Sequence, residues 1–95
     1  MEKAINAVLI HKDDNVVTVK ETLSSGSEAV FQKNGETISV TVTEDIPKFH
    51  KLALTDIPVD QLVYKYGELI GQATKTIYKG QHVHDHNIIS PKKPT

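Results

Sequence analysis

The sequence contains no cysteine, no tryptophan and no arginine. Without cysteine the chain can form neither a disulfide framework nor a thiolate nucleophile, so its metal ligands are limited to histidine, carboxylates and amides. All eleven basic residues are lysines and the formal net charge is −1. The chain therefore has neither the excess of positive charge that binds nucleic acid nor the planar guanidinium group that binds phosphate through two hydrogen bonds. We expect no nucleic acid partner.

Long hydrophobic runs are absent too. No stretch approaches the roughly 20 apolar residues that span a bilayer, and the N-terminus lacks the apolar core of a signal peptide. We therefore expect a cytoplasmic protein with no membrane partner. With 95 residues, of which 5% are aromatic, the chain can build one small domain with a core of Val, Ile, Leu and Ala. Such a core favours β-structure and leaves little room for a large enclosed active site.

Two β-hairpins are predicted from apolar runs around turn residues. The first joins residues 7–10 to residues 16–19, two β-branched runs separated by a polar turn. The second joins residues 29–32 to residues 37–42 around Asn34-Gly35, a dipeptide typical of two-residue hairpin turns. Apolar and hydroxylated residues alternate strictly along the last run, which predicts one face in the core and one towards solvent or a neighbouring subunit.

The remaining chain shows less regular patterns. Within residues 68–77, the spacing of Ile70, Ala73 and Ile77 suits a short helical turn. We find no internal repeat and no domain boundary before the Pro/Lys-rich end. The sequence thus predicts a mainly β domain over residues 1–89, with one or two short helical turns, and a polar tail over residues 90–95.

Three of the five histidines, His82, His84 and His86, lie within five residues. If the backbone there is extended, their side chains share one face, which is typical of a metal site. The alternative is a solvated strand that binds metal weakly or by accident. We interpret His11 as a solvated strand end and place His50 at the entrance of a strand.

Three ordered blocks of the chain, residues 50–57, 65–74 and 80–87, resemble the N-terminal domain of the altronate and galactarate dehydratases. They are similar as well to the separate small subunit of a relative, sulfolactate sulfo-lyase. With the opening hairpin at residues 7–17, the resemblance covers most of residues 5–89. It implies the SAF domain, a β-clip fold shared with type III antifreeze proteins and the C-terminal domain of sialic acid synthases. It also implies a lyase acting on sugar acids or similar 2-hydroxy acids, in which a larger partner carries much of the active site.

Three motifs of the family recur residue by residue: Val-His-x-His-Asn at 83–87, His-Lys at 50–51 and Lys-Tyr-Gly at 65–67. The chain departs from the family where Phe49 replaces a glycine and where Asp60-Gln61 replaces a Gly-Glu pair, which affects two loops. His82 is not part of the family pattern. The resemblance therefore reduces the three-histidine picture to His84 and His86, with His50 as a candidate third from a distant loop.

Dehydration of a 2,3-dihydroxy acid removes a proton beside a carboxylate and expels hydroxide from the next carbon. The resemblance implies that His84 and His86 are catalytic, handling these protons, or that they instead ligate a divalent metal ion. Fe²⁺ or Mn²⁺ is the expected ion, although Zn²⁺ also suits the donors. Asn87, His50 and Lys51 are predicted to bind the hydroxyls or carboxylate of the substrate.

The predicted function is the small subunit of a sugar-acid dehydratase of the altronate dehydratase type, which needs a large catalytic subunit. Met1 and the short tail favour a natural subunit over an excised domain. Two alternatives stay open: a stand-alone β-clip module that binds a sugar acid, a metal ion or a partner protein, and the small subunit of sulfolactate sulfo-lyase. A self-contained metallohydrolase is disfavoured because no HExxH motif is present. A homo-oligomer is left open.

Overall fold

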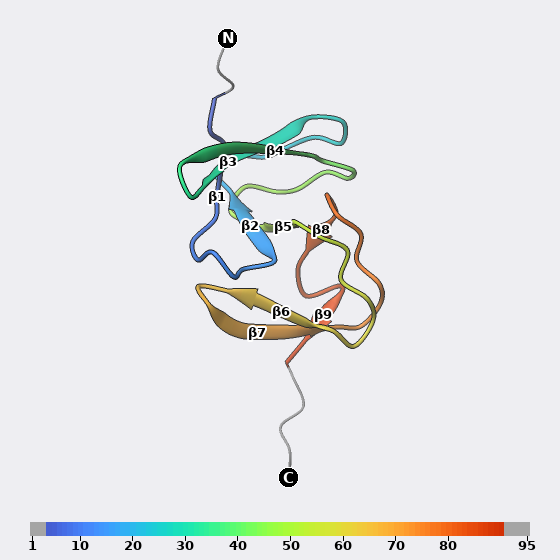
Figure 1. Cartoon of the computed structure of the whole chain (residues 1–95). Helices are drawn as coiled ribbons and strands as arrows, with labels where there is room; N and C mark the ends of the chain where they lie inside the picture. Colours follow the sequence, from blue (N-terminus) through green and yellow to red (C-terminus); the bar gives the residue numbers. More distant parts are fainter. Residues whose placement is uncertain (1–3, 91–95) are drawn as a thin grey trace.

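Figure 1 shows the computed structural model, which describes residues 4–90. In that range the chain forms nine strands and no helix, so it has no helix that could cross a membrane. The mainly β fold predicted from the sequence is confirmed. All but the first residue of the tail expected at 90–95 lies outside the described residues. The strands are β1 (Ala7–Val8), β2 (Val16–Val19), β3 (Glu28–Lys33), β4 (Glu36–Thr41), β5 (Lys51–Ala53), β6 (Leu62–Lys65), β7 (Glu68–Ala73), β8 (His82–Val83) and β9 (Ile88–Ile89).

The strands form three small antiparallel sheets. The largest, in the order β1-β2-β5-β8, lies between the β3-β4 hairpin and the sheet β6-β7-β9 (Figure 1). Val17 and Leu52 of this middle sheet pack into the core beneath β3-β4, whereas Val16 and Ala53 pack into the core above β6-β7. Successive residues of a strand face opposite sides, so the middle sheet serves both cores.

This layering explains the sequence patterns. A strand segment buried on both faces reads as a continuous apolar run, as at Val16-Val17 of β2 and Leu52-Ala53 of β5. In β4, by contrast, buried Val40 alternates with exposed Ser39 and Thr41, because only one face of that strand reaches a core. The alternation predicted along this strand is confirmed.

Both predicted hairpins form. β1 pairs with β2, with Ala7 opposite Val19. β3 pairs with β4 along six residue pairs that end at Lys33 opposite Glu36. The connecting residues Asn34-Gly35 have φ values of 52° and 81°. A two-residue turn with positive φ at both positions matches the twist of the flanking strands, which explains the Asn-Gly signal.

The helical turn expected within residues 68–77 is wrong. Residues 68–73 form β7, which pairs with β6 and with β9. Ile77 belongs to a separate extended segment and forms an isolated bridge with Ile57. The apolar residues that suggested one helical face therefore lie on two different elements. Gly71 packs so closely that an added Cβ would lie 3.1 Å from the Ile88 side chain, so this part of the chain is fixed by its strand pairing.

The structure contains an internal repeat that the sequence reading missed. Four turns share a pattern of two hydrogen bonds, the first of which runs from the amide of the fourth residue to the carbonyl of the first at 3.0 Å. In the second bond the third residue of each turn, which has a positive φ, donates its amide to the carbonyl of a residue at least 13 positions away. A buried aliphatic residue precedes each turn, and these four residues form two bridges, Leu23 with Ile46 and Ile57 with Ile77. The turns are residues 24–27, 47–50, 58–61 and 78–81.

The repeat explains where the chain departs from the family pattern. Phe49 and Asp60 are the third residues of the second and third turns, with φ values of 69° and 72°, and Gly26 and Gly80 are their counterparts, with 92° and 90°. Glycine adopts this backbone region without steric cost, which accounts for the glycines of the family. The second and third turns keep this shape although Phe49 and Asp60 carry side chains at a position whose positive φ disfavours them.

Candidate functional site: a histidine cluster beside β5 and β8

The site begins with the pairing of β5 and β8, which joins distant parts of the chain. Leu52 lies opposite His82 in this ladder, and His50 immediately precedes β5. Because alternate residues of a strand face the same side, His50 and His82 come together. Nδ1 of His50 lies 2.8 Å from Nε2 of His82, so two histidines that are 32 positions apart share a hydrogen bond.

The extended backbone assumed for His82, His84 and His86 is wrong, because β8 ends at Val83 and residues 84–87 form a turn. The turn nevertheless gathers the histidines. The ring of His84 stacks on that of His50, with centroids 4.1 Å apart, and the exposed ring of His86 lies 4.9 Å from that of His82. The cluster thus arises from a turn beside a strand pair.

Asn87 holds this turn closed. Its Oδ1 accepts the backbone amide of His84 at 3.0 Å, and its Nδ2 donates to the carbonyl of His82 at 2.7 Å. The residue is 2% exposed. Because both ends of the amide are engaged with the backbone, this placement does not favour the predicted contact between Asn87 and a substrate. The asparagine of the motif therefore positions the histidines by holding their turn closed.

His82, which the family pattern omits, lies at the centre of the cluster. Its ring centroid is 5.0 Å from that of His50, 5.8 Å from that of His84 and 4.9 Å from that of His86. Burial and then three neighbouring imidazoles lower the pKa of His82 to about 4, against the opposing charge of Glu44. Burial also lowers the pKa of His50, followed by repulsion from His84 and Lys51. Both rings are therefore neutral near pH 7, the form that ligates metals.

Glu44 is a member of the site that sequence reasoning missed. Its Oε1 accepts the backbone amide of His82 at 2.7 Å, so the carboxylate is held beside the central ring. The ligand atoms of Glu44, His82 and His86 lie within 4.8 Å of one another, and the same holds for those of His50, His82 and His84. No local pattern marks Glu44, since it lies 38 positions from its partner.

Cationic groups lie beside the cluster. Lys51, the first residue of β5, is half-buried. Burial lowers the pKa of its ammonium, and the charge of Lys65 adds to the shift while Asp85 opposes it. The two ammonium groups therefore repel each other, and an anion bound near them would relieve that repulsion. This supports the predicted substrate contact of Lys51.

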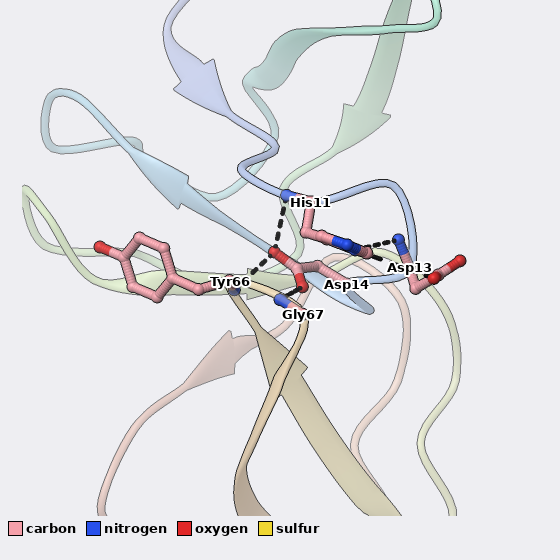
Figure 2. Close-up of polar contacts among 5 residues, drawn as sticks. All are labelled: His11, Asp13, Asp14, Tyr66 and Gly67. Atoms are coloured by element: carbon pink, nitrogen blue, oxygen red, sulfur yellow. Dashed lines mark hydrogen bonds and ion pairs between the residues drawn. The ribbon is translucent and has the colours of Figure 1, made fainter.

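The Tyr66-Gly67 part of the Lys-Tyr-Gly motif serves the fold instead. Figure 2 shows the buried carboxylate of Asp14 between the β1-β2 loop and the Tyr66-Gly67 turn. It accepts the backbone amides of His11 at 3.1 Å, Tyr66 at 2.9 Å and Gly67 at 2.8 Å. Gly67 has a φ of 72°, and an added Cβ would lie 2.9 Å from the ring of exposed His11. These three hydrogen bonds join the β1-β2 loop of the middle sheet to the β6-β7 turn. His11 takes no part in the histidine cluster.

The comparisons with known proteins agree with this architecture. The family model described as the altronate/galactarate dehydratase SAF domain matches residues 5–91. The altronate dehydratases of Escherichia coli and Bacillus subtilis are 40% and 35% identical to the chain over 80 residues, which are 84% of this chain and 15% of each relative. The alpha subunit of (2R)-sulfolactate sulfo-lyase from Chromohalobacter salexigens is 35% identical over 88 residues, which are 90% of this chain and 94% of that subunit.

The chain thus spans about 15% of the length of the altronate dehydratases, but nearly all of the sulfo-lyase subunit. The family model covers almost the whole sequence, including the turn that carries His84 and His86. The chain belongs to the SAF-domain family of the altronate and galactarate dehydratases.

Proposed function

We propose that the chain is the small, SAF-domain subunit of a sugar-acid dehydratase of the altronate dehydratase type, a hydro-lyase completed by a larger polypeptide. The observation that carries the proposal is the gathering of four imidazoles beside Lys51, in a member of this family. The rings are half-buried or exposed, so a substrate and a second polypeptide can both reach them. The cytoplasmic location predicted from the sequence is part of the proposal.

In this proposal His84 and His86 handle the two protons of the reaction. A base must take the proton beside the carboxylate, and an acid must protonate the departing hydroxyl so that it leaves as water. An imidazole can do either near neutral pH. Lys51 and His50 bind the carboxylate or hydroxyls of the acid, since an ammonium group gives a charge-assisted hydrogen bond to a carboxylate.

A divalent metal ion belongs to the same proposal, with Fe²⁺ or Mn²⁺ as the expected ions. The donors fit, because three imidazoles approach one another and, within residues 4–90, Nδ1 of His84 is buried without a hydrogen-bond partner. When bound, such an ion would hold substrate oxygens and take up the negative charge that develops beside the carboxylate. His84 and His86 would then be ligands, as the alternative to their acid–base role.

Reconstitution tests the proposal. The purified chain is assayed for loss of water from altronate and galactarate, alone and with the polypeptide from the same genome that corresponds to altronate dehydratase beyond this domain. We expect no turnover from either component and turnover from the pair. His84→Ala and His86→Ala should each remove activity, whereas His11→Ala serves as a matched control outside the cluster. Full activity of the larger polypeptide alone would contradict the proposal.

Two other functions have an observation in their favour. The sulfo-lyase alpha subunit is matched over 94% of its length, which favours the small subunit of a sulfo-lyase; sulfolactate in the same reconstituted assay distinguishes the two. The cluster forms within the chain alone, which favours a stand-alone module that binds a sugar acid, a metal ion or a partner protein. Calorimetry with the isolated chain, without the larger polypeptide, tests that function.

A further inference from the structure

We infer that His50, His82 and His84 form a binding site for one divalent ion of the class that prefers imidazole, Fe²⁺, Co²⁺, Ni²⁺ or Zn²⁺, within the isolated chain. Glu44 and His86 form a second group with His82, in which the ligand atoms also lie within 4.8 Å of one another. The inference deepens the proposed function and rests on it only for the biological role of the ion. Metal binding by the chain itself can be tested without any lyase assay.

The separations of the ligand atoms support a single ion. Two nitrogens that bind one tetrahedral ion at about 2.0–2.1 Å lie roughly 3.3 Å apart. Nδ1 of His50 and Nε2 of His82 are 2.8 Å apart, which differs from that separation by about 0.5 Å. The ion would replace the proton that these two nitrogens share, and that proton would move to the other nitrogen of its ring. A ligand nitrogen of His84 lies within 4.8 Å of one from each of the other two rings. Because the rings of His50 and His84 are stacked, one of them must turn out of the stack before both can bind the same ion.

His84 supplies the second, independent observation. Its Nδ1 is buried and has no hydrogen-bond partner among the described residues. A buried polar atom without a partner costs free energy and calls for an explanation. Its other nitrogen, Nε2, lies 4.0 Å from the carboxylate of Asp85, which is too far for a hydrogen bond, so Nδ1 is the buried nitrogen of this ring that an ion would bind.

The surroundings hold the ligands in place before any ion binds. Asn87 fixes the amide of His84 and the carbonyl of His82, and Glu44 fixes the amide of His82. His50 is the last residue of its turn, whose amide donates to the carbonyl of Pro47 at 3.0 Å. Such outer contacts restrict the rings and raise metal affinity.

The donor set narrows the choice of metal. Imidazole nitrogen suits Fe²⁺, Co²⁺, Ni²⁺ and Zn²⁺, whereas Mn²⁺ and Mg²⁺ prefer oxygen ligands. Of the two ions expected from the sequence, the cluster therefore favours Fe²⁺ over Mn²⁺. In solution the affinity should rise from Fe²⁺ through Co²⁺ to Ni²⁺, so Co²⁺ is a suitable spectroscopic probe and Zn²⁺ a suitable competitor.

The experiment titrates Co²⁺ into the metal-free full chain and follows its visible absorption, then displaces it with Zn²⁺, whose affinity is also measured by calorimetry. We expect one ion per chain and no competition from Mg²⁺. His50→Asn and His82→Asn should each weaken Zn²⁺ binding by about 100-fold or more, since even outer contacts of metal ligands are worth 10–100-fold. His11→Ala should leave the affinity unchanged, and His86→Ala should lower it by less than about 10-fold.

His84→Phe guards against a variant that simply fails to fold. Phenylalanine keeps the ring stacked on His50 and removes the buried nitrogen that has no partner. The variant should therefore unfold at the temperature of the parent chain or above it, and should lose Co²⁺ absorption. The inference is overturned if the chain binds no Co²⁺, if His11→Ala weakens binding as much as His82→Asn, or if His50→Asn keeps full affinity. The last outcome would mean that only the local run of histidines binds the ion.

Failure of this inference and failure of the proposed function give different results. A chain that binds Zn²⁺ through the three named histidines but never supports turnover retains the metal site and loses the lyase role. A reconstituted enzyme that is active while the isolated chain binds no ion retains the lyase role and loses this site.

Discussion

The turn repeat predicts that alanine has very different effects at two equivalent glycines. Gly26 and Gly80 are both third residues of their turns, with φ values of 92° and 90°. An added Cβ at Gly26 would have nothing within 4 Å, whereas one at Gly80 would lie 2.3 Å from the backbone carbonyl oxygen of Thr41. Gly26→Ala is therefore a matched control for Gly80→Ala, because the two substitutions share the backbone strain and differ in the clash.

The magnitudes follow from the contacts. The left-handed backbone costs alanine about 1–2 kcal/mol, and the lower entropy of the unfolded chain offsets about 0.4–1 kcal/mol, so Gly26→Ala should cost about 1 kcal/mol. At Gly80 the clash must also displace the backbone, which bonds to the carbonyl of Ala53 at 2.9 Å and to the amide of Thr43 at 3.0 Å. Each bond contributes about 1 kcal/mol, so the total should reach roughly 3 kcal/mol.

Urea unfolding of the two variants measures the difference in free energy, and thermal unfolding measures the corresponding shift in midpoint. Gly26→Ala should lower the midpoint of thermal unfolding by about 4–8 °C, the shift expected for 1 kcal/mol in a domain of this size, and Gly80→Ala by several times as much. Because Gly80 leads into β8, the second substitution should also weaken metal binding. Equal free energies of unfolding for the two variants would refute the reasoning, since the close approach to Thr41 would then have no energetic effect.

Three further predictions follow from single contacts. Asp14→Ala should lower the free energy of unfolding by about 3 kcal/mol in urea titrations, because three backbone amides lose their acceptor. Asp13→Ala nearby should change it by less than about 0.5 kcal/mol, and similar effects of the two substitutions would contradict the role of the Asp14 hydrogen bonds. Asn87→Ala should open the turn, lower unfolding temperature and weaken Zn²⁺ binding together, and a change in only one would separate the two roles. In the metal-free protein the pKa of His82 is about 4 in the folded chain, against an ordinary 6.5. As the pH falls from 6.5 towards 4, the unfolded chain takes up a proton that the folded chain excludes, so the free energy of unfolding should fall in that window. His82→Asn should flatten this fall, and an unchanged pH profile would contradict it.

Local sequence signals were sufficient where one local interaction decides the structure. Asn34-Gly35 predicted a hairpin because few other residues adopt positive φ at two successive positions. The helical turn failed because the spacing of Ile70, Ala73 and Ile77 was taken as one face of one element. The pairing of β7 with β6 and β9, and the bridge from Ile77 to Ile57, override such spacing. The residues of the segment alone do not indicate these partners.

The repeat and the site show the same limit. In the sequence the repeat is visible mainly as two Ile-Pro pairs, at residues 46–47 and 57–58. The other two turns lack proline, so the feature common to all four is the positive φ of the third residue. The histidine spacing predicted a cluster at the right residues through the wrong geometry. Glu44 could not be predicted, because only the folded chain brings its carboxylate to the amide of His82.

The position of His50 determines what the cluster can do for the fold. His82, His84 and His86 stay within five residues of one another even in an unfolded chain, so they can bind an ion weakly there. His50 joins them only when β5 pairs with β8 across 32 positions. An ion that uses His50 therefore favours the folded chain by the difference between its affinities for the two states. The same ion bound only to the local run would favour neither, so a rise in unfolding temperature with metal reports whether the strand pair, and not the histidine-rich segment alone, constitutes the site.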